Sequence, residues 1–323
     1  MKALLTGGTG FIGSHLAELL LDKSAEIFAL VRDPHNLKWL KGLKIHLLEG
    51  DLLTIPSLPS DIDYVFHVAG LTNSSDVADY YTVNQQGTAS LFKSLHDQKI
   101  LPKKIICLSS IAAVGPSFDG KPVQESDVPQ PITPYGKSKL RGETEALKFK
   151  EVYPIVILRA PAIFGPRDKD FLQYFKWIKR GALPAIGSKQ RYMSLCYVKD
   201  LISALYLCSQ KELESGEIFN IGNQNPYSYD EFGELAGKAM DKKLKKVRIP
   251  IPIGYLVALI ADITGRIKKK PSILNLGKFK QMRQRGWIAD MKKAKEKLSF
   301  QPQYSLQDAI QETLNWYLKH NWL

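Results

Sequence analysis

The sequence is poor in cysteine and histidine, with three cysteines and six histidines among 323 residues. Cys107, Cys196 and Cys208 are odd in number and form no Cys-x-x-Cys pair, and the histidines form no His-Glu-x-x-His motif. These absences argue against a disulfide framework and against a zinc site. They predict a cytoplasmic protein without a bound metal.

Long apolar segments are also missing. The longest lies near residues 249–263, where two prolines, a glycine and an aspartate interrupt it, so it is too short and too broken to span a bilayer. The N-terminus runs directly into glycines, and this does not resemble a signal peptide. The composition is 44% hydrophobic and 24% charged, which excludes a disordered chain and is sufficient for a sizeable core.

Acidic residues are scarce in one part of the chain only. Lys and Arg number 45 against 32 Asp and Glu, and residues 238–297 hold 18 basic but only 4 acidic residues. Aromatic residues that could stack on bases are few there, so we predict no nucleic-acid partner. A solvated basic face is the preferred interpretation. Peripheral contact of residues 249–297 with an anionic membrane, or an acidic substrate or partner, are the alternatives.

Apolar runs alternate with helical periods, which is typical of an α/β fold with a doubly wound parallel sheet (Rossmann). Strands are expected over residues 3–6, 27–31, 45–48, 64–69, 104–109, 155–159 and 217–221, buried on both faces. Helices are expected over residues 11–22, 76–97 and 135–152. Ser228 and Ser305 are predicted to cap two later helices.

Two domains are predicted from this pattern. Residues 1–165 form the Rossmann domain, with later elements of 190–222 returning to it. Residues 166–323 form mainly a smaller, mostly helical substrate-binding lobe and C-terminal helices.

A glycine-rich turn lies between the first strand and the first helix. Gly7, Gly10 and Gly13 are spaced as Gly-x-x-Gly-x-x-Gly, and Gly8 gives the narrower Gly-x-Gly-x-x-Gly variant. Such a turn lets the backbone and a helix N-terminus approach a pyrophosphate, although a plain strand–helix turn is the alternative. Arg32 follows the second strand and suits the 2′-phosphate of NADP, so NADP is favoured over NAD; the alternative is that Asp33 binds the ribose.

Tyr135 and Lys139 lie four residues apart at the start of a predicted helix, so they share one face. An ammonium group beside a phenol favours the phenolate and would make Tyr135 a general acid/base. Ser110 follows the fifth strand, at the sheet edge where α/β proteins bind ligands. Alone, the Tyr–Lys pair is expected by chance, and its value comes from these neighbours.

With these neighbours the sequence resembles the extended short-chain dehydrogenase/reductase family, also called the NAD-dependent epimerase/dehydratase family, over essentially its whole length. The matching segments are residues 6–13, Asp51-Leu52, residues 67–70, Asn84, Gly87-Thr88, Ser109-Ser110, Tyr135-x-x-x-Lys139, residues 159–166, Tyr197-Val198-x-Asp200, residues 219–222 and Trp287-x-x-Asp290.

The resemblance implies a catalytic set of Ser110, Tyr135 and Lys139, in which Tyr135 carries the proton. It also implies that the cofactor is bound by Gly7, Gly10, Phe11, Ile12, Gly13, Arg32, Asp51, Leu52, Ala69, Lys139, Pro161 and Ile163. Of these, Asp51 would bind the adenine amino group, with Leu52 against the ring, and Pro161 and Ile163 would contact the nicotinamide. Strand-end turns and a strand stop are the plainer interpretations of Asp51-Leu52 and Pro161.

Two departures bear on the substrate. Nucleotide-sugar members of the family usually have an acid where Val31 stands and commonly a phosphate-binding arginine where Met193 stands; Arg191 lies two residues off. Residues 31–34 are more similar to dihydroflavonol reductases and hydroxysteroid dehydrogenases. We therefore favour an NAD(P)-dependent oxidoreductase acting on a ketone or secondary alcohol. A nucleotide-sugar epimerase or dehydratase with tightly bound NAD, and a non-catalytic cofactor-binding module, are the alternatives.

The apolar residues after position 250 have two interpretations. They line a lipophilic substrate pocket or, as the preferred interpretation, pack the small lobe; they are Ile251, Ile253, Leu256, Val257, Leu259 and Ile260. The resemblance also implies a homodimer through helices 76–97 and 135–152, but the sequence leaves the oligomeric state open.

Overall fold

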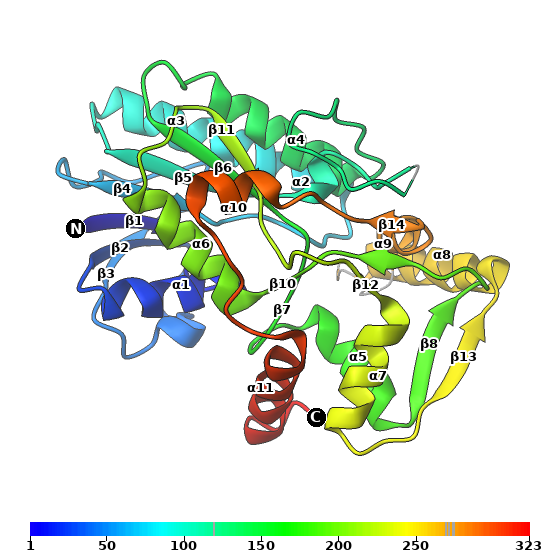
Figure 1. The fold of residues 1–323 in the computed structure, drawn as a ribbon. Coiled ribbons are helices and arrows are strands. Elements are labelled where there is room, and N and C mark those ends of the chain that lie inside the picture. The colour runs from blue at the N-terminus through cyan, green and yellow to red at the C-terminus, as the bar shows by residue number, and fades with distance from the viewer. Residues whose placement is uncertain (119, 269, 271, 273–274) are drawn as a thin grey trace.

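The computed structural model describes residues 1–118, 120–268, 270, 272 and 275–323. Its centre is a seven-stranded sheet in the order β11-β6-β5-β4-β1-β2-β3, with every neighbouring pair parallel (Figure 1). The strands are β1 (Lys2–Thr6), β2 (Glu26–Val31), β3 (His46–Glu49), β4 (Tyr64–His67), β5 (Lys104–Ser110), β6 (Ile155–Ala160) and β11 (Glu217–Asn220). The predicted doubly wound α/β fold is confirmed.

Helices cover both faces of this sheet. On one face lie α1 (Phe11–Asp22), α6 (Val198–Gln210) and α10 (Lys292–Leu298), which share a core with the inner side chains of the strands. On the other lie α3 (Gly87–Asp97) and α4 (Pro134–Leu147), where Leu91, Phe92 and Ala146 pack on the sheet. The second half of the chain therefore contributes the strand β11 to the sheet and the helices α6 and α10 to its cover.

Most strands are buried on both faces, as their uninterrupted apolar runs predict. The exception is β3, whose residues are exposed except for half-buried Leu48, because it is the edge strand and pairs only with β2. The prediction that it is buried is wrong. The strand predicted over 64–69 ends at His67, because the next residues turn to pack against the glycine turn.

The helix predicted over 76–97 contains an irregular turn. It consists of α2 (Val77–Tyr81), a π-helical turn η2 (Thr82–Gln86) and α3. A π turn inserts one residue into the helical ladder and is frequent at functional sites. The helix predicted over 135–152 ends earlier, at Leu147, because Phe149 then turns inward against Phe92 and Tyr153.

The second lobe contains more strands than the sequence indicated. Its core lies between α5 (Asp170–Lys179), α7 (Tyr229–Ala239) and α11 (Leu306–Lys319), beside a parallel pair formed by β8 (Ala182–Ile186) and β13 (Lys245–Ile249). The prediction of a mostly helical lobe missed β8, β13 and several two- or three-residue strands, since these are too short to show a periodic pattern. Ser228 and Ser305 cap α7 and α11 as predicted.

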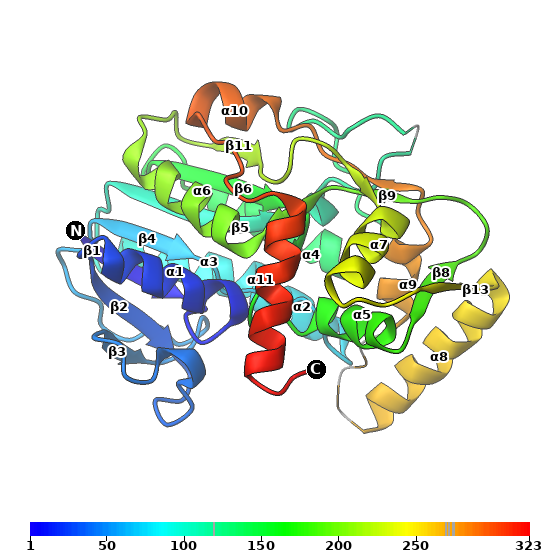
Figure 2. The same cartoon turned by 60° about the horizontal axis from the view of Figure 1, so that its bottom comes forward.

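The remaining elements are short strands and a pair of helices. β7 (Ala162–Phe164) pairs with β10 (Leu195–Tyr197), and β9 (Tyr192–Met193) lies between β12 (Tyr227–Ser228) and β14 (Gly286–Trp287). A hairpin of α8 (Ile251–Ile267) and α9 (Leu276–Met282) lies at the rim (Figure 2). Among the described residues, no helix is long and apolar enough to cross a membrane.

Candidate active site

The glycine turn lies where the strand order reverses, between β1 and β4, which is where open α/β sheets bind ligands. Gly7 has a φ of +77°, and a Cβ there would lie 2.6 Å from the backbone nitrogen of Ala69. A Cβ on Gly13 would lie 2.2 Å from the carbonyl oxygen of Gly7. Both positions therefore require glycine, and the turn closes tightly against the end of β4.

The N-terminus of α1 presents N–H groups that its own helix does not use. Gly10 is its N-cap residue, and within the described part of the chain no side chain caps these groups. An uncapped 12-residue helix behind a glycine turn is suited to bind a pyrophosphate. The predicted cofactor residues Gly7, Gly10, Phe11, Ile12 and Gly13 thus form a cradle that fits a dinucleotide.

The cradle supports a direct test with Gly13→Ala. Because the added Cβ meets backbone and not a movable side chain, we expect a loss of about 1–3 kcal/mol in the free energy of unfolding and at least roughly tenfold weaker cofactor binding. Thermal melting without cofactor and fluorescence titration measure these. Gly10→Ala is the matched control for melting, because its Cβ would meet only the Gly7 carbonyl, at 3.1 Å. Equal melting of the two variants would contradict the predicted clash.

Arg32 and Asp51 lie at one corner of the sheet. Arg32 is exposed just after β2. The pKa of the Asp51 carboxyl is lowered mainly by the backbone hydrogen bond from Leu53, and the charge of Arg32 contributes last. Asp51 Oδ1 also accepts hydrogen bonds from Thr54, so one carboxylate oxygen is used by the turn. Asp33 likewise accepts from the His35 backbone nitrogen at 2.9 Å. Leu52 packs against Gly87 at the start of α3.

Ser110 and Tyr135 meet at the carboxyl edge of the sheet. Ser110 ends β5, and its Oγ accepts from the Ala112 nitrogen at 3.1 Å. Tyr135 lies in the first turn of α4, whose N-cap Thr133 accepts from the Gly136 nitrogen. Burial raises the pKa of Tyr135 to about 12, and the hydrogen bond with Ser110 acts in the opposite direction. The phenol is therefore protonated at neutral pH, which suits a proton donor.

Lys139 lies one helical turn after Tyr135 but points elsewhere. Its Nζ donates to the Leu108 carbonyl at 2.6 Å, and burial lowers the pKa of this ammonium group. Burial thus leaves the pKa of Tyr135 above its ordinary value, and the role of Lys139 beside it stays a prediction.

A buried chain of hydrogen bonds fixes the backbone around Ala69. The Ala69 nitrogen donates to Thr6 Oγ1, which lies 2.8 Å from His67 Nδ1, while His67 Nε2 lies 3.0 Å from Thr88 Oγ1. Thr88 in turn donates to the Asn84 carbonyl. Burial lowers the pKa of His67 to about 3, so the imidazole is neutral and joins this network as an uncharged group with one partner on each ring nitrogen.

Asn84 holds the loop that follows β4. Its side-chain amide donates to the Leu71 carbonyl and to Ser138 Oγ and accepts from the Leu71 nitrogen at 2.8 Å. The π-helical turn η2 brings Asn84 to this position between α2 and α3. The resulting contacts link the loop to α4, which carries Tyr135.

Glu143 is a further residue of the site, and it is not among the residues predicted from the sequence. It forms a buried bidentate ion pair with Arg159, with N–O distances of 3.0 and 2.7 Å, and accepts from Ser109 Oγ at 2.5 Å. Both side chains are only 3% exposed. Its position four residues after Lys139 on α4, with Arg159 already noted, was the available signal. The pair joins α4 to β5 and β6 directly behind Ser110.

Comparison with known proteins shows the family to which the chain belongs. The model of the NAD dependent epimerase/dehydratase family matches residues 3–222. The chain belongs to this family. Its relatives include a ceramide reductase of Caulobacter vibrioides, 26% identical with 99% of this chain and 95% of that protein covered. An uncharacterized UDP-glucose epimerase of Bacillus subtilis is 30% identical, with 96% of each chain covered.

A solved structure of a UDP-glucuronic acid 4-epimerase from Bacillus cereus in complex with NAD is 25% identical. It superposes with a TM-score of 0.78 over 98% of this chain and 96% of that chain. The resemblance stated from the sequence is thereby confirmed. The roles of the individual site residues stay predictions.

In this epimerase/dehydratase-family chain, Pro161 directly follows β6 and Ile163 lies in β7. Pro161 is buried, and a Cβ on Gly222 would lie 3.0 Å from its ring, while Ile163 pairs with Cys196 across β7 and β10. Pro161 directly follows Ala160, which pairs with Ser110 between β6 and β5, and the prediction places the nicotinamide against Pro161 and Ile163.

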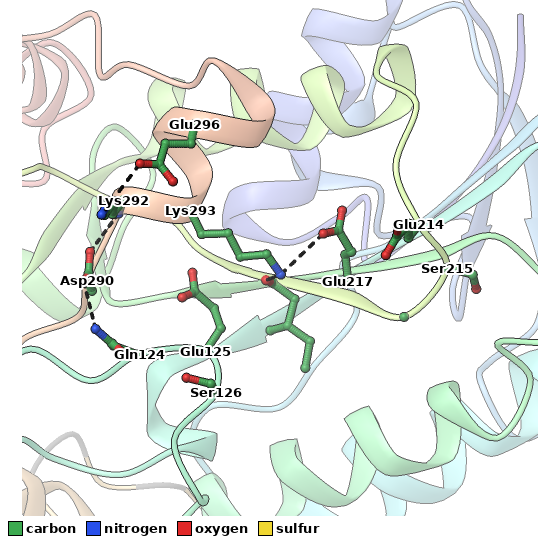
Figure 3. A pocket seen from close by; sticks show the side chains of 12 residues that line it. Gln124, Glu125, Ser126, Glu214, Ser215, Glu217, Asp290, Lys292, Lys293 and Glu296 are labelled. Carbon is green, nitrogen blue, oxygen red and sulfur yellow. Dashed lines mark hydrogen bonds and ion pairs between the residues drawn. The ribbon is translucent and has the colours of Figure 1, made fainter.

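A cavity of about 600 Å³ lies elsewhere, alongside the edge strand β11 (Figure 3). Its lining is charged, with Glu125, Glu217, Asp290 and Glu296 facing Lys293 and its neighbour Lys292. Lys293 points across the cavity toward Glu217, at 3.6 Å. The lining includes none of the predicted site residues, so this cavity is separate from the Tyr135 site.

Proposed function

We propose that this chain is an NAD(P)-dependent enzyme that transfers hydride to or from a carbon bearing a carbonyl or hydroxyl group, with Tyr135 exchanging the proton. The observation that supports this most is that Ser110, at the end of β5, and Tyr135, in the first turn of α4, lie close enough to interact at the sheet edge that also carries the glycine cradle. A non-catalytic binding module would have no need of such a pair.

Each residue then has a defined task. The backbone of the glycine turn and the N-terminus of α1 bind the pyrophosphate. When bound, the nicotinamide supplies or accepts the hydride. Ser110 and Tyr135 both hydrogen-bond the substrate oxygen, and the phenol donates its proton to a carbonyl oxygen or recovers it from a hydroxyl. Lys139 holds a positive charge beneath the site, and Asn84 fixes the loop opposite.

The comparisons favour a nucleotide sugar as substrate over the ketone that the sequence analysis preferred. Two of the three relatives described above carry UDP-glucose or UDP-glucuronic acid epimerase names. An epimerase of this kind restores its cofactor within each cycle. Purification with bound NAD, together with conversion of UDP-sugars without net NADH formation, would establish this class.

Reduction of a lipophilic ketone is the second candidate, and one observation favours it. Met193, at the place of a phosphate-binding arginine, is buried, and Arg191 Nη1 donates to the carbonyls of Ile186 and Lys189 in its own loop. Arg191 is thus used to hold that loop. The ceramide reductase relative acts, by its name, on a lipid. NADPH oxidation with lipid ketones, and none with UDP-sugars, would establish this class.

Arg32 should set the choice between the two cofactors. If Arg32 binds a 2′-phosphate, Arg32→Asp removes a cation and adds an anion there, so we expect the preference for NADP over NAD to fall by roughly tenfold or more. Titrating both cofactors measures the ratio. Arg180→Asp is the matched control, because Arg180 is exposed at the end of α5, outside the cofactor site. An unchanged ratio in Arg32→Asp would show that Arg32 does not contact the cofactor.

A further inference from the structure

The helix α8 presents an apolar stripe to solvent. Its outward residues are 48% to 77% exposed; they are Ile253, Leu256, Val257, Ile260, Ile263 and Ile267. At 100° per residue these six occupy one side of the helix. For the six apolar residues that were named from the sequence between positions 251 and 260, the preferred interpretation is that they pack the small lobe. That interpretation is wrong, because five of the six are exposed and the other, Leu259, is half-buried.

The opposite side of α8 attaches it to the protein. Its buried residues are Gly254, Ala258 and Gly265, and a Cβ on Gly254 would lie 2.7 Å from the ring of Phe279 in α9. Small residues thus let the two helices approach closely, while large apolar residues face outward. This reverses the usual pattern of a surface helix, in which the apolar face is buried. An apolar stripe exposed in this way marks an interaction surface.

The α8–α9 hairpin is anchored to the rim of the Tyr135 site. Gln281 of α9 reaches Thr133, the N-cap of the helix that carries Tyr135, at 3.4 Å. Asn73, in the loop after β4, accepts from Asn275 Nδ2 at 2.9 Å and donates to the Ser272 carbonyl. The segment that follows α8 is therefore tied to the loop after β4 and to the helix that carries Tyr135.

Basic side chains lie at both ends of the apolar stripe. Lys245 and Arg248 are exposed on β13, which leads directly into α8, and Arg266 and Lys268 are exposed at the other end. Both figures show α8 following β13 at the periphery of the molecule (Figures 1 and 2). The only acid on α8 is Asp262, which pairs with Arg266 at 2.9 Å. The surface around the stripe is therefore cationic.

We propose that α8 docks onto a lipid bilayer that contains anionic phospholipids, with its apolar stripe in the headgroup region and the flanking basic residues at the phosphates. The charge favours this occupant over a second copy of the chain, because self-docking would bring two cationic surfaces together. With 17 residues, α8 lies in the interface and does not span it. The proposal does not depend on which substrate the enzyme takes.

Vesicle sedimentation tests the proposal. We expect the wild-type chain to sediment with phosphatidylglycerol/phosphatidylcholine vesicles at low salt, and to be released from them by high salt. The variant Leu256→Glu/Ile260→Glu should bind at least roughly tenfold more weakly, because it places carboxylates in the stripe. Leu101→Glu/Val128→Glu is the matched control, since it changes two residues that are 73% and 80% exposed elsewhere.

Melting curves and cofactor titration of each variant check that the fold is retained. Failure of the wild-type chain to bind anionic vesicles at low salt would overturn the proposal, as would equal binding by the stripe and control variants. A wild-type dimer that Leu256→Glu/Ile260→Glu converts to a monomer, without vesicle binding by either, would overturn it in favour of self-association.

Discussion

Replacing Tyr135 with phenylalanine is expected to lower turnover by roughly 100-fold or more while leaving cofactor affinity within a few-fold. The ring stays in place, packed 6.2 Å from the ring of Tyr80, so only the hydroxyl is lost. That hydroxyl interacts with Ser110, and it is the group proposed to exchange the proton. Steady-state rates with the substrate found by screening, and a separate cofactor titration, divide chemistry from binding.

Tyr80→Phe is the matched control for this experiment. Its hydroxyl accepts from the Ser74 nitrogen at 3.0 Å and takes no part in the proposed chemistry, so its loss should change turnover only slightly. Full activity in Tyr135→Phe would refute the catalytic role. A second readout is pH: with the pKa of Tyr135 raised to about 12, the phenolate fraction grows tenfold per pH unit from 7 to 10. Oxidation of a hydroxyl should accelerate accordingly, whereas reduction should not.

The Rossmann half of the fold could be predicted because its strands are long, apolar and buried on both faces. Leu4, Val65, Ile106 and Ile157 have almost no exposed surface, so their positions show directly in the hydrophobic pattern. The edge strand β3 follows the same pattern without burial, because pairing on one side with β2 keeps it in the sheet. Hydrophobicity alone cannot separate these two cases.

The site was predicted where chemistry demands a specific residue, as at Gly7, Gly13, Ser110 and Tyr135. It was missed where function arises from packing between distant segments. The direction of Lys139 toward the Leu108 carbonyl depends on how α4 lies against β5, and the outward turn of α8 depends on Gly254 fitting Phe279. Neither contact can be predicted from the local sequence, because in each case the two residues lie in different elements.

The buried pair of Glu143 and Arg159 should have the largest effect on stability. Glu143→Leu leaves the Arg159 guanidinium without its carboxylate in a site that is almost fully buried, and it removes the acceptor of Ser109 Oγ. We expect the free energy of unfolding to fall by about 3–5 kcal/mol, measured by urea denaturation. The loss comes from an uncompensated buried charge, not from the removal of a favourable contact.

This cause distinguishes the pair from an ordinary ion pair, and the double variant tests it. Glu143→Leu/Arg159→Met removes both charges and fills the space with apolar atoms, so it should recover most of the stability lost in the single variant. Glu145→Ala, on the same helix, breaks the pair with the exposed Lys148 and should cost no more than about 1 kcal/mol. If the double variant is no more stable than Glu143→Leu, then the hydrogen bonds of the pair, and not charge burial, stabilise the junction of α4, β5 and β6 behind Ser110.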